Sequence, residues 1–205
     1  MRLAAENLTL ERGGRRLFAN LSFEARAGEA LVVTGPNGAG KSSLLRGLAG
    51  FLSFANGSVR LESGAAASLQ EQAHYLGHAD ALKAALTAAE NLSFWAEMLG
   101  GTAANVAPAL ARLGLPHVAD FPVRALSAGQ KRRVALARLL VAPRALWLLD
   151  EPTTALDVAA QALFAGIMRA HLETGGIVVA ATHAPLGLEG AKSVRLEGAR
   201  VGAAA

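Results

Sequence analysis

The strongest chemical signal in the sequence is a glycine-rich run that ends in a lysine and a hydroxyl side chain. Glycines let the backbone wrap around a phosphate chain with its N–H groups turned inward. Lys41 is predicted to neutralise the β- and γ-phosphates of a nucleotide, and Ser42 to ligate Mg²⁺. Ser43 is a further candidate contact. A chance glycine-rich turn is the alternative interpretation of the run, whose residues are Gly35, Pro36, Asn37, Gly38, Ala39, Gly40, Lys41 and Ser42.

A second signal is a buried strand that ends in two carboxylates. Asp150 and Glu151 directly follow the apolar run 146–149. Ligands of parallel sheets bind at the carboxyl ends of the strands. Asp150 is therefore suited to hold Mg²⁺ through water, and Glu151 to act as a general base on the attacking water. Such a strand end is common by itself, but together with the phosphate loop it predicts a hydrolytic site.

A third signal is the segment Leu126-Ser-Ala-Gly-Gln130 at the start of a predicted amphipathic helix. A serine at this position would by itself indicate only a helix N-cap. With the phosphate loop and the acidic strand, the segment resembles the LSGGQ signature of ATP-binding cassette (ABC) ATPases, with Ala128 in place of the first glycine. The basic residues 131–133 that follow are interpreted as a solvated helix face rather than a nucleic-acid patch.

The resemblance to ABC ATPases implies further site residues. Ser127, Gly129 and Gln130 would contact ATP that is held by a second subunit. Residues 154–157 resemble the D-loop, which brings Asp157 to the nucleotide. His183 resembles the switch histidine that contacts the γ-phosphate; without the resemblance it would be a strand-end histidine with no role.

Two positions depart from the ABC pattern. His78 stands where the Q-loop glutamine is expected, so it is a candidate for a catalytic and Mg²⁺-proximal role, and an ordinary loop histidine is the equal alternative. The aromatic residue that usually stacks on adenine is missing. Arg12 lies near its place and can stack on a base, while Phe18 is a second candidate.

Alternating strand and helix patterns predict the elements that position these residues. The apolar runs 30–34, 145–149 and 177–182 are typical of buried parallel strands, with helices at about 41–49 and 158–173. Residues 2–10 and 17–25 alternate like antiparallel strands, and 57–61 and 193–201 resemble short strands. We expect an α/β phosphate-loop fold in one domain over 1–205. It combines a parallel core, an antiparallel β subdomain and a helical lobe over about 79–130.

Composition narrows the function further. The 205 residues are 52% hydrophobic and 18% charged, which excludes disorder of the whole chain. The sequence has no cysteine, which excludes disulfides, thiolate metal sites and a cysteine nucleophile. No signal peptide and no membrane-spanning helix are predicted. The net charge of +4 permits an anionic partner without requiring one.

Three longer stretches, 126–139, 146–157 and 175–186, with the His at the Q-loop, resemble the ATP-binding subunits of the cytochrome c maturation (Ccm) system, a family of haem exporters. The resemblance implies ATP and Mg²⁺ as ligands and an ATP-driven head-to-tail homodimer. It also implies membrane-spanning Ccm-type subunits as partners and a peripheral location on the cytoplasmic face of the bacterial inner membrane. Neither haem nor nucleic acid is expected to bind this chain directly.

Three alternatives remain at this point. An ABC ATPase for another transported substrate would use the same motor. A soluble ABC ATPase acting on ribosomes or nucleic acid usually carries a second cassette or a long insertion, and neither is present in the sequence. A GTPase would need an N-K-x-D motif, which the sequence lacks, and a kinase would not need Ser127 and Gly129 before the acidic strand.

Overall fold

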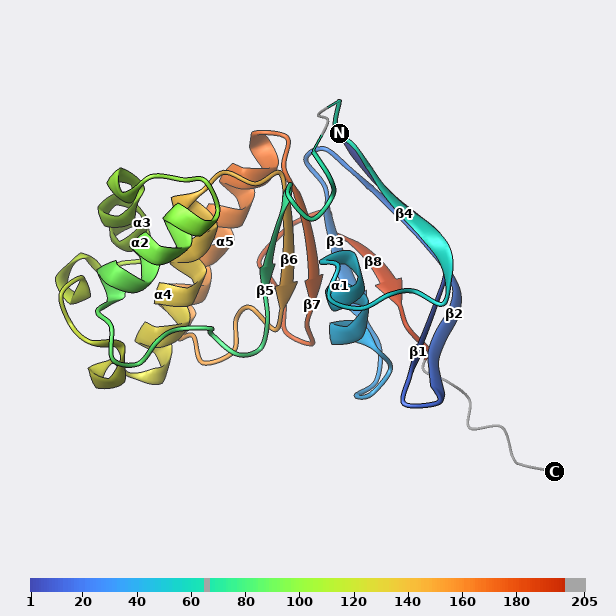
Figure 1. The fold of residues 1–205 in the computed structure, drawn as a ribbon, viewed down its shortest axis with the longest axis horizontal. Helices are drawn as coiled ribbons and strands as arrows, with labels where there is room; N and C mark the ends of the chain where they lie inside the picture. The colour runs from blue at the N-terminus through green and yellow to red at the C-terminus, as the bar shows by residue number, and fades with distance from the viewer. Residues whose placement is uncertain (65–66, 198–205) are drawn as a thin grey trace.

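The computed structural model describes residues 1–64 and 67–197 and contains two sheets (Figure 1). The larger sheet is parallel throughout, with strand order β5-β6-β7-β3-β8. Its strands are β3 (Ala30–Thr34), β5 (Ala73–Leu76), β6 (Leu146–Asp150), β7 (Ile177–Ala181) and β8 (Lys192–Arg195).

The three predicted central strands are confirmed. The sequences of β6 and β7 are buried along their whole length, as expected for strands covered on both faces. β6 runs one residue further than predicted, so that Asp150 is its last residue. The strand expected at 193–201 is the short edge strand β8, and the end of that prediction, 198–201, lies outside the described residues.

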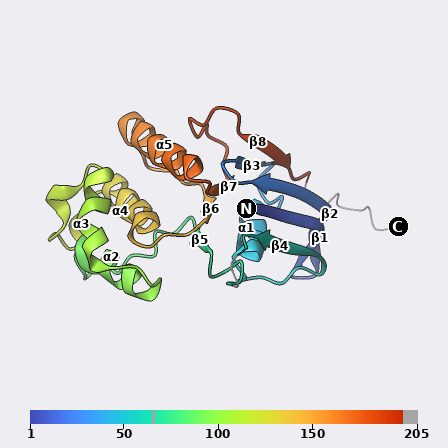
Figure 2. The ribbon, with the colours of Figure 1, turned by 90° about the horizontal axis from the view of Figure 1, so that it is seen from above.

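The second sheet is antiparallel, with order β2-β1-β4. The two long strands predicted at 2–10 and 17–25 are present, but strict alternation is not, because β1 buries the consecutive residues 3–5 and 8–10. Figures 1 and 2 place this sheet on the side of the parallel sheet opposite the helices α2, α3 and α4. Its strands are β1 (Arg2–Arg12), β2 (Arg15–Arg26) and β4 (Asn56–Glu62).

The helices divide between the two faces of the parallel sheet. α1 lies between the two sheets, and α5 covers the opposite face (Figure 2). In the described part of the chain no helix combines the length and apolar character needed to cross a bilayer. The α-helices are α1 (Lys41–Leu48), α2 (Ala88–Met98), α3 (Val106–Arg112), α4 (Ala128–Val141) and α5 (Val158–Glu173), and the 3-10 turns are η1 (Ala103–Asn105), η2 (Pro116–Val118) and η3 (Val123–Ala125).

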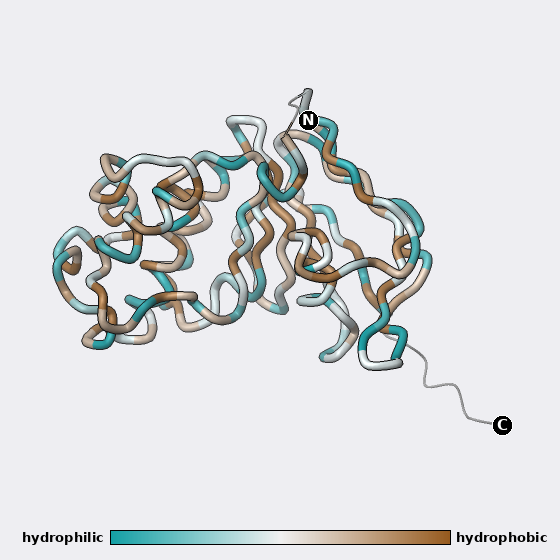
Figure 3. Tube along the Cα trace, in the orientation of Figure 1, coloured by the Kyte–Doolittle hydropathy of each residue, from teal (hydrophilic) through white to brown (hydrophobic). Residues whose placement is uncertain are grey.

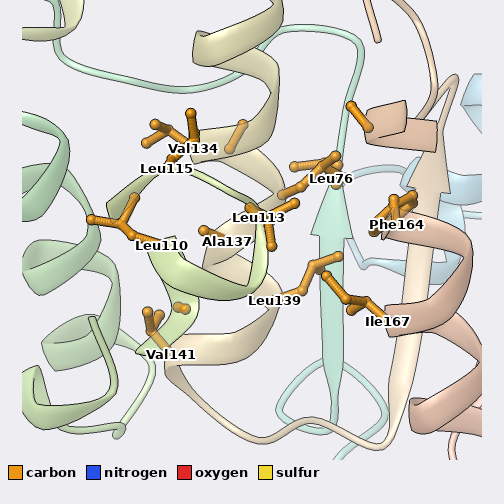
Figure 4. Packing of buried hydrophobic residues seen from close by; sticks show 14 of the residues in the cluster. Leu76, Leu110, Leu113, Leu115, Val134, Ala137, Leu139, Val141, Phe164 and Ile167 are labelled. Atoms are coloured by element: carbon orange, nitrogen blue, oxygen red, sulfur yellow. The ribbon is translucent and has the colours of Figure 1, made fainter. Parts of the chain in front are cut away.

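Buried side chains form two clusters. One joins α2, α3 and α4 to α5 and one face of the parallel sheet, and Figure 4 shows Leu139 of α4 near Ile167 of α5. The other joins the opposite face of the sheet to α1 and the antiparallel sheet. The hydrophobic colouring in Figure 3 accordingly concentrates along the parallel strands. Both clusters hold the carboxyl ends of β3 and β6 in fixed register, which is what a site at that edge requires.

Candidate nucleotide-binding and hydrolytic site

The phosphate loop connects β3 to α1, and its glycines are required by its backbone. Gly35 has φ 138°, and a Cβ there would collide with the carbonyl oxygen of Leu196. Gly40 has φ 101°, and its Cβ would lie 3.1 Å from the ring of Phe18. A side chain is strained in this region of φ. The loop can therefore close tightly over α1 only with glycine at both positions.

The N-terminus of α1 is open. Its N-cap, Gly40, provides no side-chain hydrogen bond, and no acidic residue lies in the first turn. Lys41 is largely buried, and its Nζ donates to the carbonyl oxygens of Gly35 at 2.8 Å and Pro36 at 3.1 Å. Unpaired N–H groups, the positive end of the helix dipole and an ammonium group thus meet at one place, which suits an anion.

Two of the three predicted metal ligands touch each other. Ser42 Oγ donates to Asp150 Oδ1 at 2.9 Å, and Asp150 is only 3% exposed. A hydroxyl and a carboxylate oxygen are ligands that Mg²⁺ accepts. No group of three or more His, Cys, Asp or Glu side chains arranged for a metal occurs within residues 1–64 and 67–197. The residues therefore fit a Mg²⁺ that takes its remaining ligands from water and phosphate.

Glu151 is held in a constrained position at the end of β6. Its backbone has φ 45°, which is unusual for a residue other than glycine. Its amide donates to Ala181 O at 2.8 Å, and Thr182 Oγ1 donates to Glu151 Oε2 at 3.1 Å. Thr182 is buried at the end of β7. No role was predicted for Thr182, although it directly precedes His183 at the end of a predicted strand, which is the signal that could have found it.

His183 connects the phosphate loop to this edge of the sheet. Its Nε2 lies 3.2 Å from Asn37 Oδ1, which makes Nε2 the donor in this pair. His183 and Glu151 also line one cavity of about 410 Å³. The other residues around this cavity are Arg12, Leu17, Asn37, Gly38, Gly40, Lys41, Ser42, Ser43 and Asp150.

The cavity thus brings together most of the predicted phosphate and metal residues. Arg12 lies on its wall beside Leu17. Phe18 is buried, and its ring lies close to Gly40. Ala39 is buried beneath the loop, and its amide donates to Pro36 O at 3.2 Å.

Other predicted residues lie away from this cavity. Ser127 Oγ accepts from the backbone N–H of Gln130 at 3.2 Å, and Gln130 Oε1 accepts from the N–H of Ser127 at 2.9 Å, a complete capping box on α4. A Cβ on Gly129 would lie 3.0 Å from Ala155 O, so the signature packs closely on the loop after β6. Asp157 caps α5 by accepting from Ala160 N at 2.7 Å.

His78 does not line the cavity of Lys41 and Glu151. It is exposed and lines a second cavity of about 530 Å³, together with aromatic and basic side chains such as Trp95 and Arg138. Arg138 lies over the Trp95 ring, 4.4 Å from its centroid. A catalytic or metal role for His78 stays a prediction, and the structure describes no contact that brings it to Asp150.

The interpretation of residues 131–133 as a solvated helix face is wrong for Arg132. This side chain is 3% exposed and lies beneath the end of β6. Sequence reasoning missed it because the buried stripe of α4 is wide and consists largely of small and branched apolar residues. A cation within a basic run gives no sign that backbone carbonyl groups surround it.

Comparison with known proteins agrees with this geometry. The family described as "ABC transporter" matches residues 18–154. A putative ABC transporter ATP-binding protein from Pyrococcus furiosus has the same fold, with a TM-score of 0.83 and 19% identity over 96% of this chain and 98% of that chain. The chain therefore belongs to the ABC transporter family of ATP-binding proteins, and the predicted fold class is confirmed.

Its curated relatives identify a narrower group. The "Cytochrome c biogenesis ATP-binding export protein CcmA" of Nitrobacter winogradskyi is 57% identical, covering 97% of this chain and 100% of the relative. The protein of the same name from Bradyrhizobium diazoefficiens is 54% identical, covering 97% and 99%. The chain is thus a member of the CcmA group, as the three longer sequence stretches predicted.

Proposed function

We propose that this chain is the ATP-hydrolysing subunit of an ABC transporter complex in cytochrome c biogenesis. One observation carries the hydrolytic part of the proposal. Ser42 and Asp150 are in contact and Glu151 stands next to them on the wall of the cavity that Lys41 enters. The names of the CcmA relatives support the cellular process.

Each side chain has a defined task in this proposal. Lys41 and the N-terminus of α1 bind the β- and γ-phosphates of ATP. Ser42 and Asp150 hold Mg²⁺, which when bound neutralises charge that develops on the phosphate oxygens. Glu151 orients the attacking water and accepts its proton, while Thr182 fixes the carboxylate. Bringing these groups together in advance is the main source of catalysis in phosphoryl transfer.

The capped N-terminus of α4 completes the site from a second subunit. Ser127, Gly129 and Gln130 lie outside the cavity of their own chain, and Ser127 is exposed. A head-to-tail dimer would place them against the γ-phosphate held by the partner. Asp157 would lie at the same junction. ATP then joins the subunits, and hydrolysis separates them.

The remaining partners in this proposal are membrane-spanning subunits, and this chain lies peripherally on the cytoplasmic face of the bacterial inner membrane. The driven step is transfer of haem to a periplasmic chaperone or release of the loaded chaperone. In this proposal haem does not bind to this chain, whose sequence has no C-x-x-C-H attachment motif. The second cavity, beside His78 and Trp95, is the place where a membrane subunit would dock.

The direct test compares the wild-type protein with Glu151→Gln in the presence of ATP and Mg²⁺. The wild type is expected to release phosphate. The variant should lose about 100-fold or more in kcat because the amide cannot accept the proton, while ATP affinity is retained. Co-purification of the variant from solubilised membranes, with mass spectrometry of the recovered chains, tests the partner. Recovery of permease subunits unrelated to cytochrome c biogenesis would reject that part of the proposal.

A further inference from the structure

Arg132 of α4 is enclosed by the backbone of the proposed catalytic segment. Its Nη2 donates to Asp150 O at 3.1 Å and to Glu151 O at 2.7 Å, and its Nε donates to Pro152 O at 3.2 Å. Three consecutive carbonyl groups therefore point at one guanidinium. Arg132 is not among the residues that line the cavity that Lys41 enters.

The remaining guanidinium nitrogen reaches the loop that follows β5. Arg132 Nη1 donates to Gly77 O at 3.1 Å and to Asp80 Oδ1 at 2.9 Å. A guanidinium has five N–H donors in a rigid plane. The five described hydrogen bonds use the whole set, so the group connects the β5 loop to the end of β6.

The Arg132–Asp80 pair differs from the other ion pairs among the described residues. The Arg132 side chain is 4% exposed and that of Asp80 is 28% exposed, whereas the cation in every other described pair is at least 43% exposed. A buried pair is screened little by solvent, and removing one partner leaves an uncompensated charge. Asp80 therefore supplies the counter-charge that permits Arg132 to lie beneath Glu151.

The geometry of Glu151 needs such support. Its φ of 45° is costly for a residue with a side chain and persists only when surrounding contacts enforce it. The Glu151 amide is held by Ala181 O on one side, and its carbonyl is held by Arg132 on the other. Both ends of the residue are thus fixed, which also fixes the direction in which its carboxylate leaves the backbone.

We propose that Arg132 is a positioning residue for Glu151, and that Asp80 holds Arg132 in place. Arg132 acts through the backbone of residues 150–152 and makes no contact with ATP. This inference rests on the proposed ATPase function for its kinetic test. It deepens that function by adding a buried support that reaches the catalytic carboxylate from the helix behind the signature segment.

The test uses Arg132→Gln, Arg132→Lys and Asp80→Asn in the full-length protein. Arg132→Gln is expected to lower kcat about 100-fold, the effect of a displacement of about 1 Å at a reacting group, with KM for ATP changed less than about threefold. Arg132→Lys should recover part of kcat, because an ammonium reaches some of the carbonyls but cannot form the planar fork. Asp80→Asn, which preserves shape, should lower kcat by less and should add nothing in the Arg132→Gln background.

Arg133→Gln is the matched control. Arg133 is the next residue of α4, and its Nη1 donates to a single carbonyl, that of Leu113, at 3.2 Å. Neither Arg133 nor Leu113 lines the cavity that Lys41 enters. Its loss is expected to cost stability without a comparable fall in kcat. A fall equal to that of Arg132→Gln would overturn the proposal, as would unchanged kcat in both Arg132→Gln and Asp80→Asn.

Hydrogen–deuterium exchange gives a readout that does not depend on activity. The backbone amides of Asp150, Glu151 and Thr153 are expected to exchange faster in Arg132→Gln and Asp80→Asn than in the wild type, and at the wild-type rate in Arg133→Gln. Unchanged exchange there contradicts the role of Arg132. If the wild type hydrolyses no ATP but the variants differ from it in exchange as expected, the proposed function is rejected. The support that Arg132 gives to the backbone of Glu151 then still stands.

Discussion

The N-termini of α1 and α4 are both expected to face phosphate, and they begin in different ways. α1 starts at Gly40, which has a left-handed backbone and offers no side-chain cap. α4 starts at Ser127, whose hydroxyl and backbone are both paired with Gln130 in a capping box. The N-terminal N–H groups of α1 are therefore left for an external anion, whereas in α4 the N–H group of Gln130 already has a partner within the chain.

The difference suggests an order of events. An anion at α1 meets unpaired donors and the nearby Lys41, so a single subunit is able to bind ATP there. An anion at the N-terminus of α4 competes with the capping box. We therefore expect α4 to bind phosphate only when a second subunit holds the phosphate close to it. We therefore expect ATP to bind first at α1, and α4 to act in closure of the proposed dimer.

The largest expected effect is on ATP binding, in Lys41→Ala. The ammonium makes charge-assisted hydrogen bonds with phosphate, worth roughly 2–3 kcal/mol, so ATP affinity should fall about 30- to 150-fold. Isothermal titration of the isolated protein measures this. Lys192→Ala removes an exposed lysine paired with Glu29 and serves as the control. Equal ATP affinities of the Lys41 variant and the control would contradict the assignment of the N-terminus of α1 as the phosphate-binding helix end.

The second expected effect separates turnover from binding, in Ser127→Ala. Removing a donor aimed at developing charge costs about 100-fold in kcat, while ATP affinity of the single subunit should stay unchanged. Loss of the cap should also cost about 1 kcal/mol of stability. Thr87→Ala is the matched control because Thr87 forms the same kind of capping box with Glu90 on α2. A fall in kcat shared by both variants would reduce Ser127 to a structural cap.

The smallest expected effect on turnover concerns the far end of α4. Ala142 follows α4, and its carbonyl accepts from His74 Nε2 at 2.8 Å. Burial lowers the pKa of His74 to about 4. In the unfolded chain His74 is protonated below about pH 6.5, whereas in the folded chain it stays neutral down to about pH 4. The free energy of unfolding therefore decreases as the pH falls from about 6.5 to about 4.

The size of the His74 effect is at most about 1.4 kcal/mol per pH unit. His74→Gln retains a donor for Ala142 O but has no such titration, so its unfolding free energy should change less between pH 6.5 and 4. Urea unfolding at several pH values measures the difference, and kcat at pH 7 should be near that of the wild type. Parallel stability curves for the two proteins would contradict the assignment of this titration to His74.

The parts of the site that the sequence predicted are those determined by local backbone chemistry. Gly35 and Gly40 are needed for positive φ angles, and the short apolar run before Asp150 is typical of a buried strand, so their positions follow from neighbours in the chain. The helix start at Ser127 is likewise a local pattern. The central strands β3, β6 and β7 were predictable for the same reason.

The parts that the sequence did not predict depend on contacts distant in the chain. Arg132 is buried because carbonyls from β6 and an acid from the β5 loop surround it, and a helical pattern does not contain that information. Thr182 gained a role only through its contact with Glu151. β5 is a short edge strand whose pairing partner, β6, is far along the chain.

The central claim, that α1 and α4 of different subunits meet at one ATP, is tested most directly by site-specific disulfide formation. The chain contains no cysteine, so each introduced thiol is unique. Asn37→Cys marks the phosphate loop and Ala128→Cys marks the start of α4, and both positions are exposed. The two variants, each in the Glu151→Gln background, are mixed with ATP and Mg²⁺ and then oxidised.

The expected product is a disulfide between the two different variants that requires ATP, with little product from either variant alone. Phosphate loops and signature segments would then face each other across the dimer. A disulfide between two Asn37→Cys chains, or no disulfide although ATP binding is measured in the same sample, would contradict the head-to-tail arrangement and the division of labour between α1 and α4.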